Sequence, residues 1–592
     1  MEQARAAIKT RAKQLYPDFI FFLSSMRFLP VTAGALLVEL PDLPRTLALL
    51  RALQAGPPEG VTEVIPAART LLVHYEPWRL DDAQLAAAVA AIAQKAESAA
   101  QSAAESGAPP EEAAGALVHI PVRYDGEDLA EVAAHLGLSA AQVIARHTAQ
   151  PWQVAFAGFA PGFAYLSGGD AVFDVPRRAS PRTRIPPGAV ALAGRFSGVY
   201  PRASPGGWQL IGQTEVPMWD LARTPPALLQ PGQRVQFVDA ATEAGRELLE
   251  RWRTPSRCAV AASSSAPDSC APDGGGDGEA PVLEVLAPGL QALVQDLGRP
   301  GQAGQGVSAS GALDRGAFLA ANRLVGNHFN APALELLHGG FTVRALGPAV
   351  VAVTGAEGPL TLRRQDGAAL PAARHAPLAL QAGDTLALGA PEAGLRSYLA
   401  ARGGFAAQPV LGSCASDTLA GIGPAPLAAG QRLGLGRRES RHGPLASVAA
   451  HPEAASPHLP RPGDAAAVWL DITFGPRADW FSPQALALLL EQPWQVTPQS
   501  NRVGLRLAGS QPLQRAAAFE GAELPSEGTA LGALQVPANG QPVLFLADHP
   551  LTGGYPVVGC VAAHHLDLAA QLPAGTLIRF RAQSPFQEIC LS

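Results

Sequence analysis

Short apolar runs separated by glycine- and proline-rich turns fill most of this chain from Trp152 onward. Runs such as WQVAFAGF, AVALAG and GWQLIGQT each suit one β-strand, and 61 glycines and 55 prolines in 592 residues supply turns between them. This texture predicts β-barrels or sandwiches, and hence a mostly β protein of the α+β class. The chain is also too long for one hydrophobic core, so we expect several domains.

The beginning of the chain has a different pattern. After an N-terminal extension (1–26), the sequence predicts a strand, a helix, two strands around Pro66, a helix, and the strand ALVHIPVRY. That order predicts a ferredoxin-like βαββαβ unit within residues 27–150. Two short helices close this region, and Ser139 is a candidate N-cap for the second.

Low-complexity stretches divide the remainder. Residues 251–281 are rich in Ser, Gly and Pro without apolar periodicity, which predicts a flexible linker between two fused halves. One β-barrel is predicted before it (151–250) and two after it (282–436 and 465–592), with a low-complexity loop at 437–464. The late stretch TALGALQVPANGQPVLFLADHPLTGGYP loosely repeats PPGAVALAGRFSGVYPRASPGGWQLIG, which suggests that barrels of the two halves are related.

Composition excludes several kinds of function. The net charge of −6 leaves no basic field for nucleic acid or an anionic membrane. Lys9, Lys13 and Lys95 are the only lysines, so a Schiff-base or Walker A lysine cannot occur beyond them. Five cysteines form no CxxC pair, which argues against a zinc site or a disulfide framework. Without a signal-peptide or membrane-spanning pattern, we expect a cytoplasmic protein.

Candidate functional residues lie in glycine-rich turns, since no GxSxG elbow, HExxH or strand-coupled GxGxxG occurs. Arginine forks and glycine amides suit carboxylate or phosphate oxygens, and acidic side chains can act as general base or Mg²⁺ ligand. The predicted catalytic residues are Asp296, Arg299, Glu527 and Asp548. The predicted substrate- or nucleotide-binding residues are His147, Gly158, Pro161, Gly162, Arg182, Thr183, Arg184, Gly206, Gly207, Asp314, Asn501, Arg502, Gly553 and Gly554.

Several of these residues also have a structural interpretation. Asp296 and Arg299 can pair across their own turn. Asp314 can cap a helix that begins at the next residue, and His147 can be a satisfied histidine at a helix end. Both interpretations stay open from the residues alone.

Long motifs in a consistent order resemble a known family. GFAPGFAYL, PRRASPRTRIPPGAVALAG and GVYPRASPGGWQLIG, within about 27–240, resemble the kinase A inhibitor family, also called allophanate hydrolase subunit 1 or the B component of 5-oxoprolinase. GLQALVQDLGRPG, SNRVGLRL and QVPANGQPVLFLADHPLTGGYP, within about 282–583, resemble its companion, allophanate hydrolase subunit 2 or the C component of 5-oxoprolinase. The resemblance implies cyclophilin-like barrels, one in the first half and two in the second, and a cleft between the halves.

The resemblance also implies an activity. It points to an ATP-dependent 5-oxoprolinase that opens the lactam of 5-oxo-L-proline to L-glutamate, with ATP, Mg²⁺ and the LamB/YcsF-type A component of that enzyme. Two alternatives stay open: a biotin-dependent carboxyltransferase component like that of urea carboxylase, and a non-enzymatic inhibitor of a sensor histidine kinase. No biotin-attachment lysine exists in the second half, so a biotin role requires a partner. In the ADHPLTGGYP turn we expect Asp548 rather than His549 to act; metal ligands and oligomeric state are not assigned.

Overall fold

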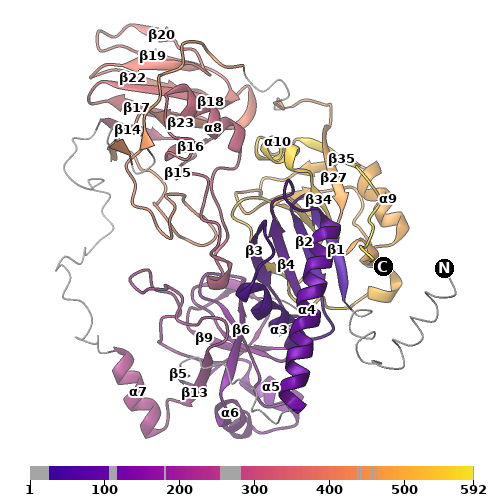
Figure 1. Cartoon of the computed structure of the whole chain (residues 1–592). Coiled ribbons are helices and arrows are strands. Elements are labelled where there is room, and N and C mark those ends of the chain that lie inside the picture. Colours follow the sequence, from indigo (N-terminus) through magenta and orange to yellow (C-terminus); the bar gives the residue numbers. More distant parts are fainter. Residues whose placement is uncertain are drawn as a thin grey trace, which may run out of the picture.

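The structure is a computed structural model, and Figure 1 shows how its elements are arranged. It describes residues 26–105, 117–178, 180, 182–253, 282–436, 439–440, 443–454, 459–461 and 463–590. Most of the predicted extension and linker lies outside the described residues. The four bodies are the N-terminal domain (26–105), the first barrel (117–253), the sandwich (282–436) and the second barrel (463–590).

The N-terminal domain is one antiparallel sheet covered by two helices. Its elements are β1 (Arg27–Thr32), β2 (Ala35–Glu39), α3 (Leu43–Ala55), β3 (Val61–Pro66), β4 (Thr70–Tyr75) and α4 (Asp82–Glu105), and the strand order is β1-β2-β4-β3. Helix α3 begins after Asp42, whose side chain accepts the Arg45 N–H at 2.9 Å. Leu49, Leu53 and Val89 pack the helices onto one face of the sheet.

The predicted ferredoxin-like βαββαβ order is wrong in two places. The first strand region is a hairpin, because Gly34 (φ +87°) allows the chain to reverse between β1 and β2. The predicted last strand, β5 (Leu117–Val122), leaves this sheet and pairs in parallel with β13 (Arg234–Asp239) of the first barrel. Pairing with a distant strand cannot be read from local periodicity.

The first barrel is a seven-stranded sheet of order β12-β9-β10-β7-β6-β13-β5. Its edges meet through paired backbone hydrogen bonds of 2.8 Å between Arg123 and Gln213. Its further elements are α5 (Leu129–Leu136), α6 (Ala140–Ala149), β6 (Trp152–Ala157), β7 (Ala164–Ser167), β8 (Arg182–Ile185), β9 (Ala189–Ala193), β10 (Phe196–Val199), β11 (Ser204–Gly206), β12 (Gln209–Gln213) and α7 (Glu243–Arg253). Strands β8 and β11 pair as a separate arm.

The first body after the linker is a sandwich of a six-stranded and a five-stranded sheet around one core, so the barrel predicted for 282–436 is wrong. The long strands β18 and β23 pair antiparallel within the five-stranded sheet, and neither of the two sheets closes into a ring. Its elements are β14 (Leu283–Pro288), β15 (Gln291–Gln295), η1 (Ala303–Gln305), α8 (Arg315–Leu324), β16 (Ala333–Leu337), β17 (Phe341–Ala345), β18 (Ala349–Glu357), β19 (Leu360–Arg363), β20 (Ala369–Pro371), β21 (Pro377–Leu380), β22 (Thr385–Leu388), β23 (Ala393–Ala401) and β24 (Arg432–Leu433).

The second barrel is closed, in the order β27-β34-β31-β32-β29-β28-β35. It follows the small hairpin of β25 (Glu439–Ser440) and β26 (Gly443–Pro444). Its elements are β27 (Val468–Phe474), η2 (Ala478–Trp480), α9 (Pro483–Glu491), β28 (Trp494–Val496), β29 (Gly504–Ala508), η3 (Ala517–Phe519), β30 (Glu527–Gly528), β31 (Ala533–Gln535), β32 (Val543–Phe545), β33 (Thr552–Gly553), β34 (Val557–Val561), η4 (Ala563–His565), α10 (Leu566–Ala570) and β35 (Leu577–Ala582). The predicted mostly β, α+β class is therefore confirmed, while the cyclophilin-like detail stays a prediction.

The two barrels share one topology. Reading the second barrel's ring from β34 through β35 to β27 reproduces the first barrel's order from β12 through β13 to β5, strand for strand. In both, the first strand pairs in parallel with the last, and a separate two-stranded arm is present. The relation suggested by the repeated sequence pattern is thus confirmed.

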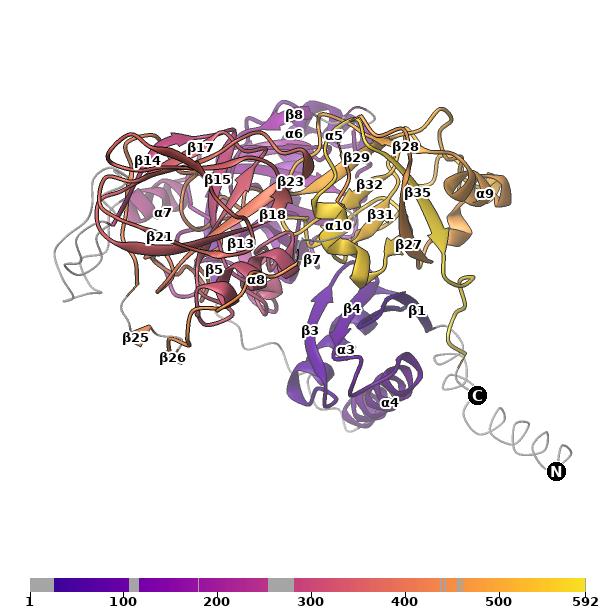
Figure 2. The same cartoon turned by 90° about the horizontal axis from the view of Figure 1, so that it is seen from above.

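The N-terminal domain lies against the second barrel, as Figures 1 and 2 both show for β1–β4 beside β27 and β34. Leu29, Leu37 and Leu72, on the sheet face opposite the helices, pack with Ala530 and Leu551. In the part of the chain that the structure describes, no helix is long and apolar enough to cross a membrane.

Candidate active site between the two barrels

A cavity of about 1330 Å³ lies between the first and the second barrel. The first barrel contributes the loops after β6 and β10, and the second contributes the loops around β29, β31 and β33. Equivalent loops of two related barrels therefore face each other across one space. Among the predicted site residues, those that line it are Gly206, Gly207, Asn501, Gly553 and Gly554.

Direct hydrogen bonds hold the halves together beside this cavity. The Phe159 N–H donates to Thr552 Oγ1 at 3.1 Å, and the Gly162 N–H donates to the Gln305 carbonyl at 2.9 Å. A Cβ on Gly158 would lie 2.4 Å from Thr552 Oγ1, so only glycine permits this approach. The GFAPGFAYL loop is thus a contact between the halves, which meet here within one chain.

Two arginines of the cavity form no ion pair with a carboxylate among the described residues. Arg178 is paired with Asp128 at 2.7 Å, whereas Arg177 makes only a 3.4 Å bond to Ser526 Oγ. Arg202 forms no hydrogen bond or ion pair with any residue that the structure describes, and burial lowers its pKa while the charge of Asp417 opposes that shift. These two guanidinium groups are therefore available for an anion.

The wall behind these arginines is aromatic. The Phe163 ring centroid lies 5.1 Å from that of Tyr200 and 5.3 Å from that of Trp208, both edge to face. Phe159, partly exposed, continues the cluster at 5.3 Å from Phe163. Such packing holds the wall rigid and offers an apolar surface next to the cations.

His147 lies in the core of the first barrel and does not line the cavity. Its ring nitrogens lie 2.7 Å from Tyr124 Oη and 2.9 Å from Ser197 Oγ. Its ring also stacks on Phe237 at 4.4 Å. Burial lowers the pKa of His147 to about 3, so it is neutral at physiological pH.

The arm strand β8 places Arg182, Thr183 and Arg184 outside the cavity lining. Arg182 donates to both carboxylate oxygens of Asp128, at 2.9 and 2.8 Å, and Asp128 also accepts the Leu210 N–H at 2.7 Å. Thr183 and Arg184 are exposed. Arg182 is therefore engaged within its own barrel.

Asp296 and Arg299 follow β15 and are both buried. Asp296 accepts from Ser413 Oγ at 2.6 Å and from the Cys414 N–H at 2.7 Å, so it holds the facing loop. Arg299 donates to the carbonyls of Val410 and Ala415. Neither residue lines the cavity. Among the described residues their charges attract each other without a direct ion-pair contact, so the pairing considered above is not formed as a contact.

Asp548 and Arg502 form the center of a buried charge network between the sandwich and the second barrel. Arg502 donates to both Asp548 oxygens at 3.0 Å and to Glu335. Ser310 and Thr418 complete the set of donors to Asp548. Burial alone would raise the pKa of Asp548, but Arg502 and the hydroxyl donors hold it below its usual value. Asp548 is thus an ionised, fully hydrogen-bonded carboxylate.

Asp314 also lies between the sandwich and the second barrel. Its carboxylate accepts the Ala317 N–H at 2.8 Å, which caps α8, and the Gln571 amide at 2.6 Å. Burial raises its pKa to about 6. The helix-cap interpretation of Asp314 is thus confirmed.

Glu527 lies where the second barrel meets the N-terminal domain. Arg477 donates to both of its oxygens, at 2.9 and 3.0 Å from Nε, and to Glu39 at 3.0 Å. Glu527 is 7% exposed and Arg477 3%. Glu527 is therefore bound in an ion pair behind the cavity wall.

Sequence reasoning missed Arg177 and Arg202. Both follow a proline, in VPRRAS and YPRAS, and both stretches were noted only as family motifs. What separates them from Arg178 and Arg182 is that, among the described residues, neither forms an ion pair with a carboxylate, and that is a property of the folded chain.

The fold and the cavity define a mostly β protein with a cationic cavity between two related barrels. Residues 26–229 match the carboxyltransferase domain, subdomains C and D, and residues 305–582 match its subdomains A and B. The chain belongs to this carboxyltransferase-domain family.

Individual relatives fall into two groups. The chain is 36% identical to the C component of 5-oxoprolinase from Escherichia coli K12 over 305 residues, covering 50% of this chain and 90% of that protein. It is 50% identical to the B component from Escherichia coli O157:H7 over 125 residues, covering 21% and 57%. It is also 32% identical to the urea amidolyase of Lachancea kluyveri over 311 residues, covering 50% and only 17%.

A solved structure covers nearly the whole chain. The crystal structure of the protein TTHA0988 is 33% identical, has a TM-score of 0.71, and covers 92% of this chain and 99% of its own. The arrangement of both halves in one polypeptide therefore has a structural precedent.

Proposed function

We propose that this chain is the fused B and C component of an ATP-dependent 5-oxoprolinase, which opens 5-oxo-L-proline to L-glutamate together with a LamB/YcsF-type A component. The cavity carries the proposal. It is built jointly by the regions that resemble the B and C components, and it holds Arg177 and Arg202, which form no ion pair with the residues that the structure describes. We place the substrate carboxylate and the nucleotide phosphates there.

The size and donors of the cavity support this placement. Pockets for single small ligands span roughly 300–1,000 Å³, and the 1330 Å³ here leaves room for a nucleotide beside a small lactam. Guanidinium forks bind carboxylate and phosphate oxygens in pairs. Mg²⁺ would arrive on the phosphates and needs few protein carboxylates; Glu520 and Glu523 line the cavity and are the candidates.

The chemistry explains why ATP is required. A lactam carbonyl is a poor electrophile, and transfer of the γ-phosphoryl group to its oxygen, with ADP leaving, activates the carbonyl carbon. One water then adds to that carbon and the ring C–N bond breaks, with the nitrogen leaving as the amine. A second water hydrolyses the resulting acyl phosphate, so the products are glutamate, ADP and phosphate. The arginines would neutralise the charge that develops on the transferred group. The predicted catalytic roles of Asp296, Arg299, Glu527 and Asp548 stay predictions; all four are buried, and none of them belongs to the cavity lining.

The decisive experiment follows both products. The purified chain, with and without a LamB/YcsF-type component, is incubated with ATP, Mg²⁺ and 5-oxo-L-proline, and glutamate and ADP are measured together. Coupled formation of both only in the complete mixture supports the proposal. As a matched pair, Arg202→Gln should abolish most turnover and the exposed Arg195→Gln should not. If neither glutamate nor ADP forms although both proteins are folded, the proposed 5-oxoprolinase function is rejected.

A second candidate function is carboxyl transfer, favoured by the similarity to urea amidolyase. It predicts that the chain consumes carboxylated biotin in the presence of urea without any LamB/YcsF-type component. The same protein preparation distinguishes the two candidates, because lactam opening requires ATP and carboxyl transfer from preformed carboxybiotin does not.

A further inference from the structure

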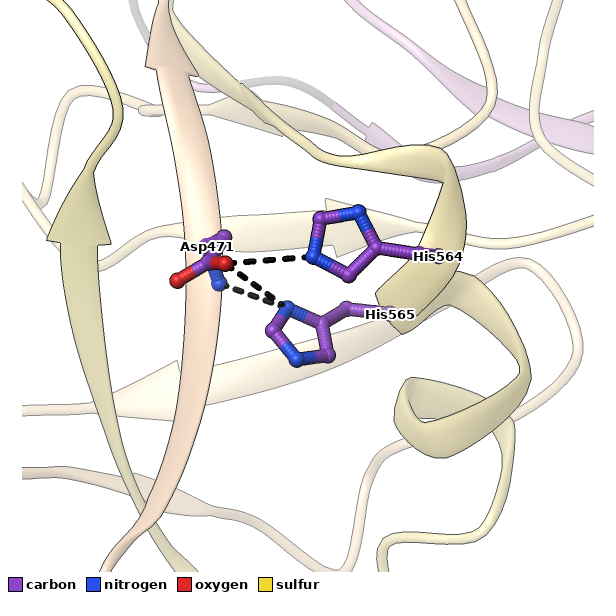
Figure 3. Close-up of side chains that lie close together, drawn as sticks. All are labelled: Asp471, His564 and His565. Carbon is purple, nitrogen blue, oxygen red and sulfur yellow. Dashed lines mark hydrogen bonds and ion pairs between the residues drawn. The ribbon is translucent and has the colours of Figure 1, made fainter.

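A carboxylate and two imidazoles converge on the second barrel, away from the cavity lining (Figure 3). Asp471 lies on β27, and His564 and His565 belong to η4, which follows β34. His564 Nε2 lies 3.1 Å from Asp471 Oδ2, and His565 Nδ1 lies 3.9 Å from the same oxygen. The three ligand atoms lie within 4.8 Å of one another.

These separations suit a tetrahedral metal ion. Bonds of about 2.0–2.1 Å to nitrogen and oxygen place neighbouring ligand atoms roughly 3.4 Å apart, and the two observed distances lie on either side of that value. Arg581 Nε donates to the other oxygen, Oδ1, at 2.7 Å. This bond orients the carboxylate so that Oδ2 faces the imidazoles, as outer partners of metal ligands do.

One of the two imidazoles already presents a lone pair, and the other must exchange a proton for the metal. The Asp471 N–H donates to His565 Nδ1 at 2.8 Å, so this nitrogen carries a lone pair and no proton. Binding requires the His565 ring to turn from the amide toward Oδ2, and it replaces the proton shared by His564 and Asp471.

We propose that Asp471, His564 and His565 form a site for a divalent transition metal of the Zn²⁺ class, with water as the fourth ligand. The His564 side chain is 62% exposed, which leaves an open path for the ion and the water. Two nitrogen ligands favour Zn²⁺, Co²⁺ or Ni²⁺ over Mg²⁺ and Ca²⁺. The first barrel has Pro121 where the second has Asp471, by strand register, so the site is peculiar to the second barrel.

The bound ion would stabilise the contact between the second barrel and the sandwich. Helix α10 follows η4 directly, and its Asp567 accepts the N–H groups of Arg315 and Gly316 at the start of α8, at 2.9 and 3.1 Å. Linking η4 to β27 therefore also restrains the residues that hold α8. This role is independent of the reaction proposed for the cavity.

Co²⁺ titration of the tag-free, chelator-treated full chain tests the site. We expect one equivalent of Co²⁺ to bind with visible absorption bands of a four-coordinate ion, and Zn²⁺ to displace it and raise the melting temperature. His564→Ala should weaken binding at least tenfold and remove the thermal shift. The control His135→Ala, an exposed histidine on α5, should change neither.

The variants keep the proposal testable if one of them is unstable. His564 is largely exposed, so His564→Ala should melt like the parent protein in chelator. His565→Ala provides a second loss of one ligand. Binding that is unchanged in both variants, or no Co²⁺ bound by the parent protein at about 100 μM, would overturn the proposal.

Discussion

The two barrels have the same strand order but opposite charges at one equivalent ion pair. The Asp128 N–H donates to the Leu210 carbonyl at 3.0 Å, as the Arg477 N–H donates to the Val557 carbonyl at 3.1 Å. These positions are therefore equivalent. The partner on the arm strand is Arg182 in the first barrel and Glu527 in the second, each opposite a glycine of the facing strand.

The reversed charges of the two ion pairs indicate the role of the arm-strand position. A catalytic role depends on the sign of the charge, whereas an ion pair that fastens the arm to the barrel needs only opposite signs. Both pairs are buried at the carboxylate, and both are bidentate. Arg182 and Glu527, which the sequence singled out separately, thus occupy the same structural place in two copies of one fold.

The helix between the first and second strands of each barrel shows a second contrast. Both barrels have QPWQV directly after a helix, at 150–154 and 492–496. Trp152 Nε1 donates to the carbonyl of His147, and Trp494 Nε1 to that of Leu489, at 3.1 and 3.0 Å. His147 therefore occupies the position of a core leucine, which explains its burial.

The largest expected effect is the loss of the second ion pair. Arg477→Met leaves Glu527 and Glu39 without their shared partner in a buried interface, which should cost about 3–5 kcal/mol of unfolding free energy. Arg182→Met should cost clearly less, because Asp128 keeps Arg178 and the Leu210 N–H. Urea unfolding of both variants measures the difference. Equal losses would mean that Arg178 and the Leu210 N–H do not stabilise Asp128 once Arg182 is removed.

Acidification should destabilise the first barrel through His147, whereas the equivalent position of the second barrel, Leu489, does not titrate. The pKa of His147 is lowered to about 3, so the unfolded chain binds its proton first and stability is lost as pH falls below about 6.5. His147→Leu, which copies the second barrel, should reduce this loss by up to about 1.4 kcal/mol per pH unit between about pH 6 and 3.

The comparison of slopes isolates this histidine. Asp314 and Asp417, each with a pKa raised to about 6 by burial, act in the opposite direction: the folded chain holds their protons longer, so they favour folding as pH falls from about 6 to 4. They are present in both proteins and cancel. Denaturant titrations at pH 7, 6, 5 and 4 give the slopes. Parallel pH profiles would show that His147 is not the titrating group.

The cavity walls should differ in their share of anion binding. Arg202→Gln removes a guanidinium with no carboxylate partner from the first-barrel wall, and we expect at least tenfold weaker ATP or 5-oxo-L-proline binding. Arg506→Gln, on the exposed second-barrel wall, should weaken it less. Isothermal titration of both variants measures this. A larger effect from Arg506 would move the anion site to the second barrel.

Local patterns predicted part of this molecule well. The mostly β class and the relation between barrels follow from strand-length apolar runs and turn residues, which act over a few positions. The destination of β5 does not, because its partner β13 lies more than 100 residues away. The same limit applies to the cavity. Gly206 and Gly553 could be predicted from local turn chemistry, whereas the lack of an ion pair at Arg202 depends on the positions of Asp128 and Asp417 in the folded chain.

The smallest expected effect concerns the two equivalent helix starts. Ser139 and Ser482 cap α6 and α9 by accepting from Gln142 N at 3.3 Å and from Ala485 N at 3.1 Å. Ser482→Ala should cost about 1 kcal/mol. Ser139→Ala should cost less, because the Gln142 side chain still accepts the backbone N–H of residue 139, at 2.8 Å in the parent protein. Urea unfolding at pH 7 measures both. If Ser139→Ala were the costlier change, the remaining half of the capping box would not hold the start of α6. The first barrel would then depend on its serine cap more than the second barrel does.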